Sequence, residues 1–158
     1  MISLEPIGII HSPFTEVEGM PIQPAGAKGV QGTVEVYGRF VDGLCDLDGF
    51  SHIILLYHFH RSREWSLKVR PFMDPSERGL FATRAPNRPN PIGISVVRLD
   101  GIEGGTLSIS DVDILDGTPL LDIKPYVPEF DNVDSCRTGW LEEARKGVRG
   151  TRSDERFR

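Results

Sequence analysis

The chain has 158 residues, enough for one domain with a proper hydrophobic core. Its hydrophobic content of 39% and charged content of 26% are typical of a soluble globular protein. The longest apolar run, residues 53–57, is far too short to span a membrane, so no membrane partner is expected. The net charge of −5 argues, taken alone, against a nucleic-acid partner.

The distribution of charge weakens that last argument. Residues 61–98 hold eight basic and three acidic side chains, whereas residues 100–134 hold nine acidic side chains and one lysine. A separation of this kind can place a basic face on an acidic protein. Chance composition of loops is the alternative explanation, and the sequence does not decide between them.

The two cysteines, Cys45 and Cys136, do not form a CxxC pair. This argues against a disulfide framework and against a zinc ribbon, and it fits a reducing compartment. The first residues also lack the pattern of a secretory signal peptide. We therefore expect a cytoplasmic protein.

Short strands separated by turns are expected along most of the chain. Apolar periodicity and β-branched residues predict them at residues 2–10, 33–37, 51–60, 92–99, 106–110 and 120–124, with residues 112–115 either continuing a strand or beginning another. Gly104 and Gly105 predict a hairpin turn, and residues 116–119 a second turn.

Little helix is expected between these strands. Residues 40–47 predict a short helix or turn, and residues 15–29 and 61–78 predict long loops. The spacing of Trp140, Leu141, Ala144 and Val148 predicts a short amphipathic helix near the C-terminus.

The fold class that follows is mainly β: a single-domain antiparallel β-barrel, or a strongly bent sheet, with short peripheral helices. No GxGxxG motif leads from a strand into a helix and no Walker A loop occurs, so the fold is not Rossmann. We assign residues 1–137 to the barrel domain and residues 138–158 to a charged tail that carries the short helix.

The segment of residues 79–93 is the most unusual part of the sequence. It holds three prolines together with Arg84, Asn87, Arg88 and Asn90. Because proline fixes φ and restricts the residue before it, the loop is expected to be stiff. A stiff loop can direct its donors at an anionic or nucleotide-like ligand at little entropic cost, although a plain proline-rich turn has the same composition.

Three histidines lie in or beside the expected strand at residues 51–60. His52, His58 and His60 share one face if the strand continues, because strand side chains alternate. Two histidines two residues apart, with a carboxylate from elsewhere, can bind a metal. No third ligand is visible nearby, so strand-end histidines bonded to backbone or water are the preferred interpretation, and no metal is expected.

Asp122 and Lys124 place a carboxylate and an ammonium on the same face of a strand end. Such a pair can hold a ligand that carries both charges, such as the amino and carboxyl groups of an amino-acid moiety. An ordinary surface salt bridge is the alternative.

Several different short motifs are spread along the chain from residue 8 to about residue 128. They lie at residues 8–14, 48–52, 59–60, 70–71, 79–84, 87–95, 116–119 and 122–126. The most specific are FATR…RPNPIG, which starts at Phe81, and DGTP…DIKPY, which starts at Asp116. Together the motifs resemble the TsaA-like, or TrmO, family of tRNA methyltransferases.

The resemblance implies a small β-barrel that binds S-adenosylmethionine outside any Rossmann fold and methylates the N6 atom of threonylcarbamoyl-adenosine beside the tRNA anticodon. It also implies a homodimer with the cofactor near the subunit boundary. The implied cofactor contacts are Pro21, Ile22, Gln23, His60, Arg61, Arg84, Ile94, Asp122, Ile123, Lys124 and Pro125. Family members often have an arginine where this chain has Ile22, so only backbone contacts are expected there.

Removing the N6 proton of the substrate helps methyl transfer, and His60 and Asp122 are the candidate bases. The substrate carboxylate favours a planar cation, for which Arg84 or Arg88 is expected. Two other functions stay open. One is a metal-dependent small-molecule enzyme that uses His58 and His60, and the other is a non-enzymatic RNA-binding module.

Overall fold

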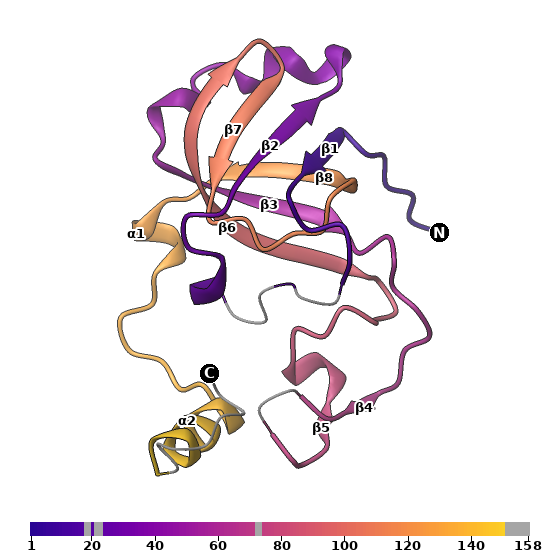
Figure 1. Ribbon diagram of the computed structural model, residues 1–158, viewed down its shortest axis with the longest axis vertical. Coiled ribbons are helices and arrows are strands. Elements are labelled where there is room, and N and C mark those ends of the chain that lie inside the picture. Colours follow the sequence, from indigo (N-terminus) through magenta and orange to yellow (C-terminus); the bar gives the residue numbers. More distant parts are fainter. Residues whose placement is uncertain (18–19, 21–23, 72–73, 151–158) are drawn as a thin grey trace.

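The structure, a computed structural model, describes residues 1–17, 20, 24–71 and 74–150, and of these the side chains of residues 24–25 and 146–150 are not described. Figure 1 shows a compact β-structure at one end of the molecule and an extended loop region with a C-terminal helix at the other.

Six antiparallel strands close into a barrel, which confirms the expected fold class. The strands neighbour one another in the order β1, β2, β7, β6, β3, β8, and β8 returns to β1. Their bounds are β1 (Gly8–His11), β2 (Gln31–Val36), β3 (His52–His58), β6 (Ile92–Glu103), β7 (Thr106–Ser110) and β8 (Thr118–Pro125). Closure leaves these strands no unpaired sheet edge.

The sequence pattern explains which side chains fill the barrel. In β3 and β6 every second residue is buried, including Ile53 and Leu55 on one strand and Val97 on the other. Leu107 and Ile109 of β7 also point inward, and both are almost completely buried. Because successive strand side chains point to opposite faces, the alternate residues of β3 and β6 line the outside.

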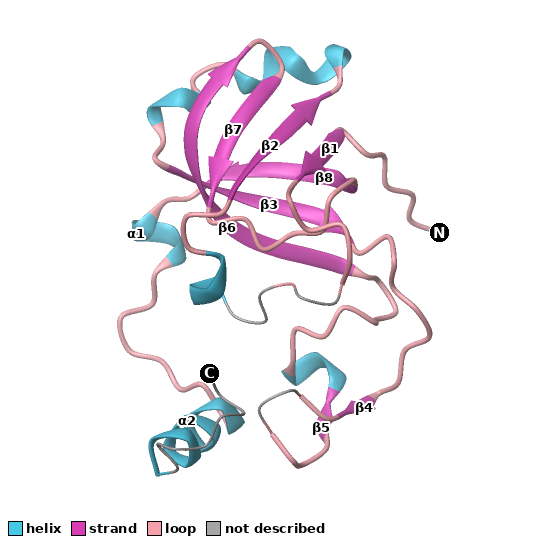
Figure 2. Ribbon diagram, viewed as in Figure 1, coloured by secondary structure: helices cyan, strands magenta, loops and turns pink. Residues whose placement is uncertain are grey.

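The remaining elements are short, as Figure 2 shows. A two-stranded ribbon pairs β4 (Lys68–Val69) with β5 (Arg78–Gly79). The 3-10 helices are η1 (Pro24–Ala27), η2 (Gly38–Leu44), η3 (Leu47–Gly49) and η4 (Leu80–Ala82), and the α-helices are α1 (Pro128–Asp131) and α2 (Trp140–Gly150). Helices were expected at residues 40–47 and near Trp140, and both expectations are confirmed by η2 and α2. In the part of the chain that the structure describes, no helix has the length and apolar character needed to cross a membrane.

Several expected boundaries were wrong, including the end of the strand expected at residues 92–99, which continues to Glu103. The first strand begins at Gly8 rather than Ile2, and residues before it are exposed, Ile2 to 89%. Residues 112–115 form no strand, because Asp111 has a φ of 68° that ends β7. Val112 and Ile114 are nonetheless buried in the core. The turn expected over residues 116–119 is confined to residues 116–117, since β8 begins at Thr118.

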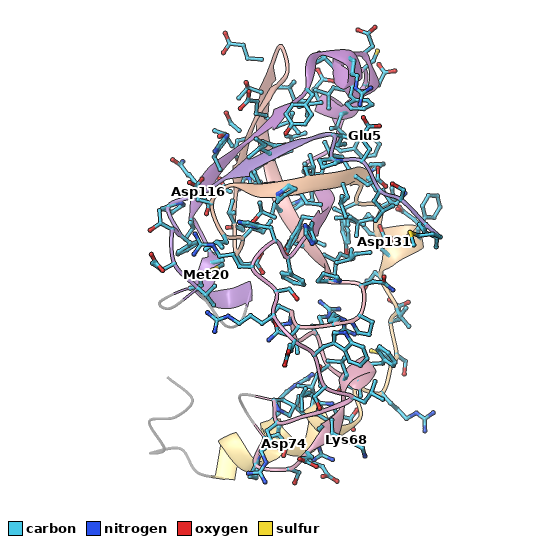
Figure 3. The ribbon with its side chains drawn as sticks, turned by 90° about the vertical axis from the view of Figure 1, so that its right-hand side faces the viewer. Glu5, Met20, Lys68, Asp74, Asp116 and Asp131 are labelled. Atoms are coloured by element: carbon cyan, nitrogen blue, oxygen red, sulfur yellow. The ribbon has the colours of Figure 1, made fainter. Side chains whose placement is uncertain are left out.

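The C-terminal segment runs from the barrel to the opposite end of the molecule (Figure 1). There the indole Nε1 of Trp140, the first residue of α2, donates a hydrogen bond of 2.9 Å to the carbonyl of Ala82 in η4. In Figure 3, Lys68 and Asp74 lie at this same end, far from Glu5. The helix is thus attached to the loop that carries Arg84.

Candidate functional site

The outer face of strands β3, β6 and β8, hereafter the outer face, carries several of the predicted contacts in adjacent rows. Ile94 of β6 and Asp122 of β8 both pair with Leu56 of β3. In the next row, Val96 and Lys124 both pair with Ile54. The closed sheet therefore brings Ile94, Asp122 and Lys124 to one surface.

The charges on this face are paired. The Lys124 ammonium lies 2.9 Å from Asp122 Oδ2, and both side chains are about half exposed. A pair in contact with solvent contributes little to folding, so both groups remain available to a ligand.

An exposed apolar row lies beside the charged pair. Ile92, Ile94 and Val96 follow one another on the outside of β6 with exposed fractions of 41%, 49% and 46%. Three neighbouring apolar side chains exposed to this degree are unusual on a surface that contacts only water. The outer face therefore combines an apolar strip with a zwitterionic pair.

Residues 79–93, hereafter the proline-rich loop, connect β5 to the start of β6 at the end of the outer face. Arg88 is half-buried, and its Nη1 donates to the carbonyls of Thr83 and Ala85 at 2.9 and 3.0 Å. Asn87 Oδ1 accepts a hydrogen bond of 2.8 Å from the Arg63 amide. These bonds support the expectation of a stiff loop and give Arg88 a role inside it.

Arg84 differs from Arg88 in that its side chain is exposed. Its charge is near enough to the Tyr57 phenol to oppose, in small part, the rise of the phenol pKa. Arg84 is therefore an exposed cation whose charge still acts on the buried Tyr57 phenol.

His60 and Arg61 follow the end of β3 and are both exposed. Partial burial lowers the pKa of His60, and the charges of Arg61 and His58 lower it further. The imidazole is therefore neutral near pH 7 and can accept a proton. His60 lies four residues beyond Leu56, which pairs with Asp122, so the two candidate bases occupy different parts of the site.

A buried polar chain supports the site from within the barrel. The Tyr57 hydroxyl lies 2.8 Å from Ser95 Oγ, which donates a hydrogen bond of 2.6 Å to Asp113 Oδ1. Burial raises the pKa of Tyr57 to about 12. The Tyr57 ring also contacts Gly93, where a Cβ would come within 2.3 Å of it.

Sequence reasoning missed this chain, although a signal was present. Ser95 occupies an inward position of β6, where the alternation calls for an apolar residue. A buried hydroxyl needs partners, so its position predicts a polar neighbour inside the barrel. Nothing in the sequence identifies that neighbour as Asp113.

The other predicted contacts lie apart from the outer face. Ile123 and Pro125 pair with the inward residues Leu55 and Ile53, and together with Asp122 they line a cavity of about 400 Å³ that also includes Leu47 and Phe50. Pro21, Ile22 and Gln23 lie outside the described residues. Among the residues that the structure describes, no three His, Cys, Asp or Glu side chains gather as a metal site, and His58 is exposed at the end of β3.

Comparison with known proteins decides the family. The protein-family model for the tRNA-methyltransferase O N-terminal domain matches residues 9–132 of the sequence. The chain belongs to the tRNA-methyltransferase O family. This confirms the family expected from the FATR and DGTP motifs.

Relatives and solved structures agree with this membership. A probable S-adenosyl-L-methionine-binding protein of Pyrococcus abyssi is 59% identical over 99% of this chain and 85% of its own length. The human tRNA (adenine(37)-N6)-methyltransferase is 36% identical over 81% of this chain, which spans only 31% of that protein. A crystal structure of TrmO from Pseudomonas aeruginosa matches with a TM-score of 0.76 and 40% identity, over 96% of this chain and 76% of that one.

Proposed function

We propose that this chain transfers the methyl group of S-adenosylmethionine to the N6 atom of threonylcarbamoyl-adenosine beside the anticodon of a tRNA. The observation that carries the proposal is the arrangement of the outer face. The Asp122–Lys124 pair lies across β3 from exposed Ile94, and the loop with Arg84 leads into the start of β6, opposite the end of β3.

Membership of the family accounts for the type of reaction and for the methyl donor. The chain is a member of a family of tRNA methyltransferases, and several relatives are named for binding S-adenosylmethionine or for methylation that depends on it. The expectations of a methyltransferase and of this methyl donor are confirmed to that extent. The choice of threonylcarbamoyl-adenosine as the methylated nucleotide remains our proposal.

The residues present fit S-adenosylmethionine in chemical character. The cofactor supplies a methyl group activated by a sulfonium, together with an amino-acid end and an adenine. Lys124 and Asp122 offer opposite charges to the carboxylate and amino group of that end. Leu56 pairs with Asp122 on one side and with Ile94 on the other. Leu56 and Ile94 therefore offer apolar surface to the adenine of the cofactor.

A base near the acceptor nitrogen assists the transfer, because the carbamoyl group makes the N6 proton more acidic. His60 suits this role because its lowered pKa keeps the imidazole unprotonated. Asp122 is the second candidate, but its carboxylate is also the group proposed to bind the amino group of the cofactor, beside Lys124. We therefore propose His60 first, with Arg61 beside it as a cofactor contact.

Arg84 is proposed to bind the threonyl carboxylate of the substrate or to reach the cofactor. Its guanidinium is exposed on a loop that is held by other residues, so little ordering is needed when an anion binds. Arg88 is the second candidate for the carboxylate, with its Nη1 already bonded to the loop.

A homodimer belongs to the proposal as well. The exposed row of Ile92, Ile94 and Val96 is an apolar strip that a second subunit can cover, which would place the cofactor near the boundary between subunits. We propose that this dimer acts on tRNA in the cytoplasm.

Substitution of Arg84 by alanine tests the proposal. Arg84→Ala should reduce methylation of tRNA that carries threonylcarbamoyl-adenosine by about a hundredfold, since a charge-assisted bond to the reactant is lost. Arg39→Ala is the matched control, because Arg39 is an exposed arginine of η2 that pairs with Glu5 near the chain start. Wild-type turnover by Arg84→Ala would exclude the proposed role of Arg84.

A further inference from the structure

One aromatic side chain beside Arg84 is exposed without a function in the site described above. Phe81 lies in η4, three residues before Arg84, and its side chain is 74% exposed. A ring exposed to this degree contributes little to folding, so its surface is free to contact a ligand. What distinguishes Phe81 from other exposed rings is its position on the loop that carries Arg84.

The backbone around Phe81 is held on both sides. Leu80 is 1% exposed, and its amide donates to the Leu67 carbonyl at 2.9 Å. On the other side, Thr83 donates both its amide and its hydroxyl to the Leu80 carbonyl, at 3.1 and 2.8 Å. Trp140 donates to the carbonyl of Ala82, the next residue. The ring is thus presented from a fixed backbone.

One arginine lies beside this ring, and others lie nearby along the chain. The Arg88 guanidinium carbon lies 5.9 Å from the centre of the Phe81 ring, and Arg84 is exposed on the same loop. Arg78, three residues before Phe81, lies over the Trp140 ring instead and is paired with the Asp74 carboxylate. An exposed ring with Arg88 beside it and Arg84 on the same loop suits a ligand that has both a flat apolar face and negative charge.

Unpaired nucleotides have both properties. Their bases stack on aromatic side chains, and their phosphates bind arginine. A rigid presentation lowers the entropic cost of stacking because the platform needs no ordering.

We propose that Phe81 is the stacking platform for an unpaired base of the RNA substrate, next to the nucleotide that enters the site. The inference rests on the proposed function, because it takes RNA as the substrate. It goes further by assigning the contact to one ring and by stating that the RNA is read in single-stranded form at the proline-rich loop.

The chain offers a matched control. Phe130 of α1 is 83% exposed, and its neighbours Glu129 and Asp131 are acidic. It has the same side chain and a similar exposure, but it lies in surroundings that repel phosphate. A change at Phe130 reports the general effect of removing an exposed phenyl ring.

The test uses a 17-nucleotide RNA stem-loop with the anticodon-loop sequence and 2-aminopurine next to the target adenosine. Binding to the wild-type protein should quench the probe, because stacking on an aromatic ring quenches this base. Phe81→Leu should weaken affinity about tenfold and abolish the quenching, whereas Phe81→Trp should retain both. Phe130→Leu should bind and quench like the wild type.

Unfolding midpoints in urea should be equal for all four proteins, since both rings are exposed. Wild-type affinity and quenching in Phe81→Leu would overturn the platform, and so would equal losses in Phe81→Leu and Phe130→Leu or an absence of quenching by the wild type. Failure of the proposed function is a separate result, because binding of the stem-loop is measured without cofactor and without methylation.

Discussion

The hydroxyl of Tyr57 donates a hydrogen bond to Ser95 Oγ inside the barrel, across 2.8 Å. The direction follows from the next link, in which Ser95 uses its own proton to bond Asp113 at 2.6 Å. Tyr57 belongs to β3, which is followed by His60, and Ser95 belongs to β6, which follows the proline-rich loop. Their bond therefore fixes the two strand ends that carry the proposed site.

Tyr57→Phe should lower the free energy of unfolding by about 1 kcal/mol, because it removes one buried hydrogen bond and keeps the ring. Urea denaturation measures this as a lower midpoint with an unchanged slope. Tyr37→Phe is the control, since Tyr37 is 38% exposed. Equal midpoints for wild type and Tyr57→Phe would show that the bond contributes nothing.

Stability at alkaline pH should depend on the same phenol. Burial raises the Tyr57 pKa to about 12, whereas tyrosine in an unfolded chain ionises near roughly 10. Between these values the unfolded chain has lost the proton that the folded chain keeps, so the free energy of unfolding falls as pH rises. The stability of wild type relative to Tyr57→Phe should therefore decrease between pH 10 and pH 12. A constant difference in urea denaturation across that range would contradict the raised pKa.

Gly93→Ala should destabilise the fold by about 1–3 kcal/mol through overpacking. The added Cβ would lie 2.3 Å from Tyr57 Cε2 and 2.8 Å from Phe59 Cζ, so both rings or the strand backbone must move. Gly101→Ala in the same strand is the control, because nothing lies within 4 Å of a Cβ there. Thermal melts of the two variants measure the difference, and equal melting temperatures would contradict the packing described.

Lys124→Ala should weaken binding of S-adenosylmethionine about tenfold in calorimetry, since it removes the cation proposed for the cofactor carboxylate. The melting temperature should hardly change, because the Lys124–Asp122 pair is exposed. Arg98→Ala removes an exposed cation of β6 that pairs with Asp100, and it should leave the affinity unchanged. Equal affinities for wild type and Lys124→Ala would remove Lys124 from the cofactor site.

The strands that were predicted well are those in which burial follows a simple rule. Residues 106–110 alternate and form β7, and the apolar run at residues 51–60 contains β3. Local rules failed at residues 112–115, where a strand was expected. The positive φ of Asp111 ends β7 before these residues, and the sequence pattern does not predict that angle. Local rules also failed for the β4–β5 ribbon, whose two-residue strands are too short to show a period.

The site was only partly accessible from sequence for a related reason. The alternation of β8 places Asp122 and Lys124 on one face, and this was predicted. Their position across β3 from Ile94 depends on strand order and register, which arise from pairing between distant segments. The Tyr57–Ser95–Asp113 chain joins residues 38 and 18 positions apart, and no local pattern predicts that.

The central claim is tested most directly by the mass of the modified nucleoside. Purified protein and S-adenosylmethionine are incubated with two matched tRNAs, one with threonylcarbamoyl-adenosine beside the anticodon and one with unmodified adenosine there. We predict the mass gain of one methyl group on the threonylcarbamoyl-adenosine and none on the unmodified adenosine. Absence of that product, or equal methylation of both tRNAs, would contradict the proposed substrate.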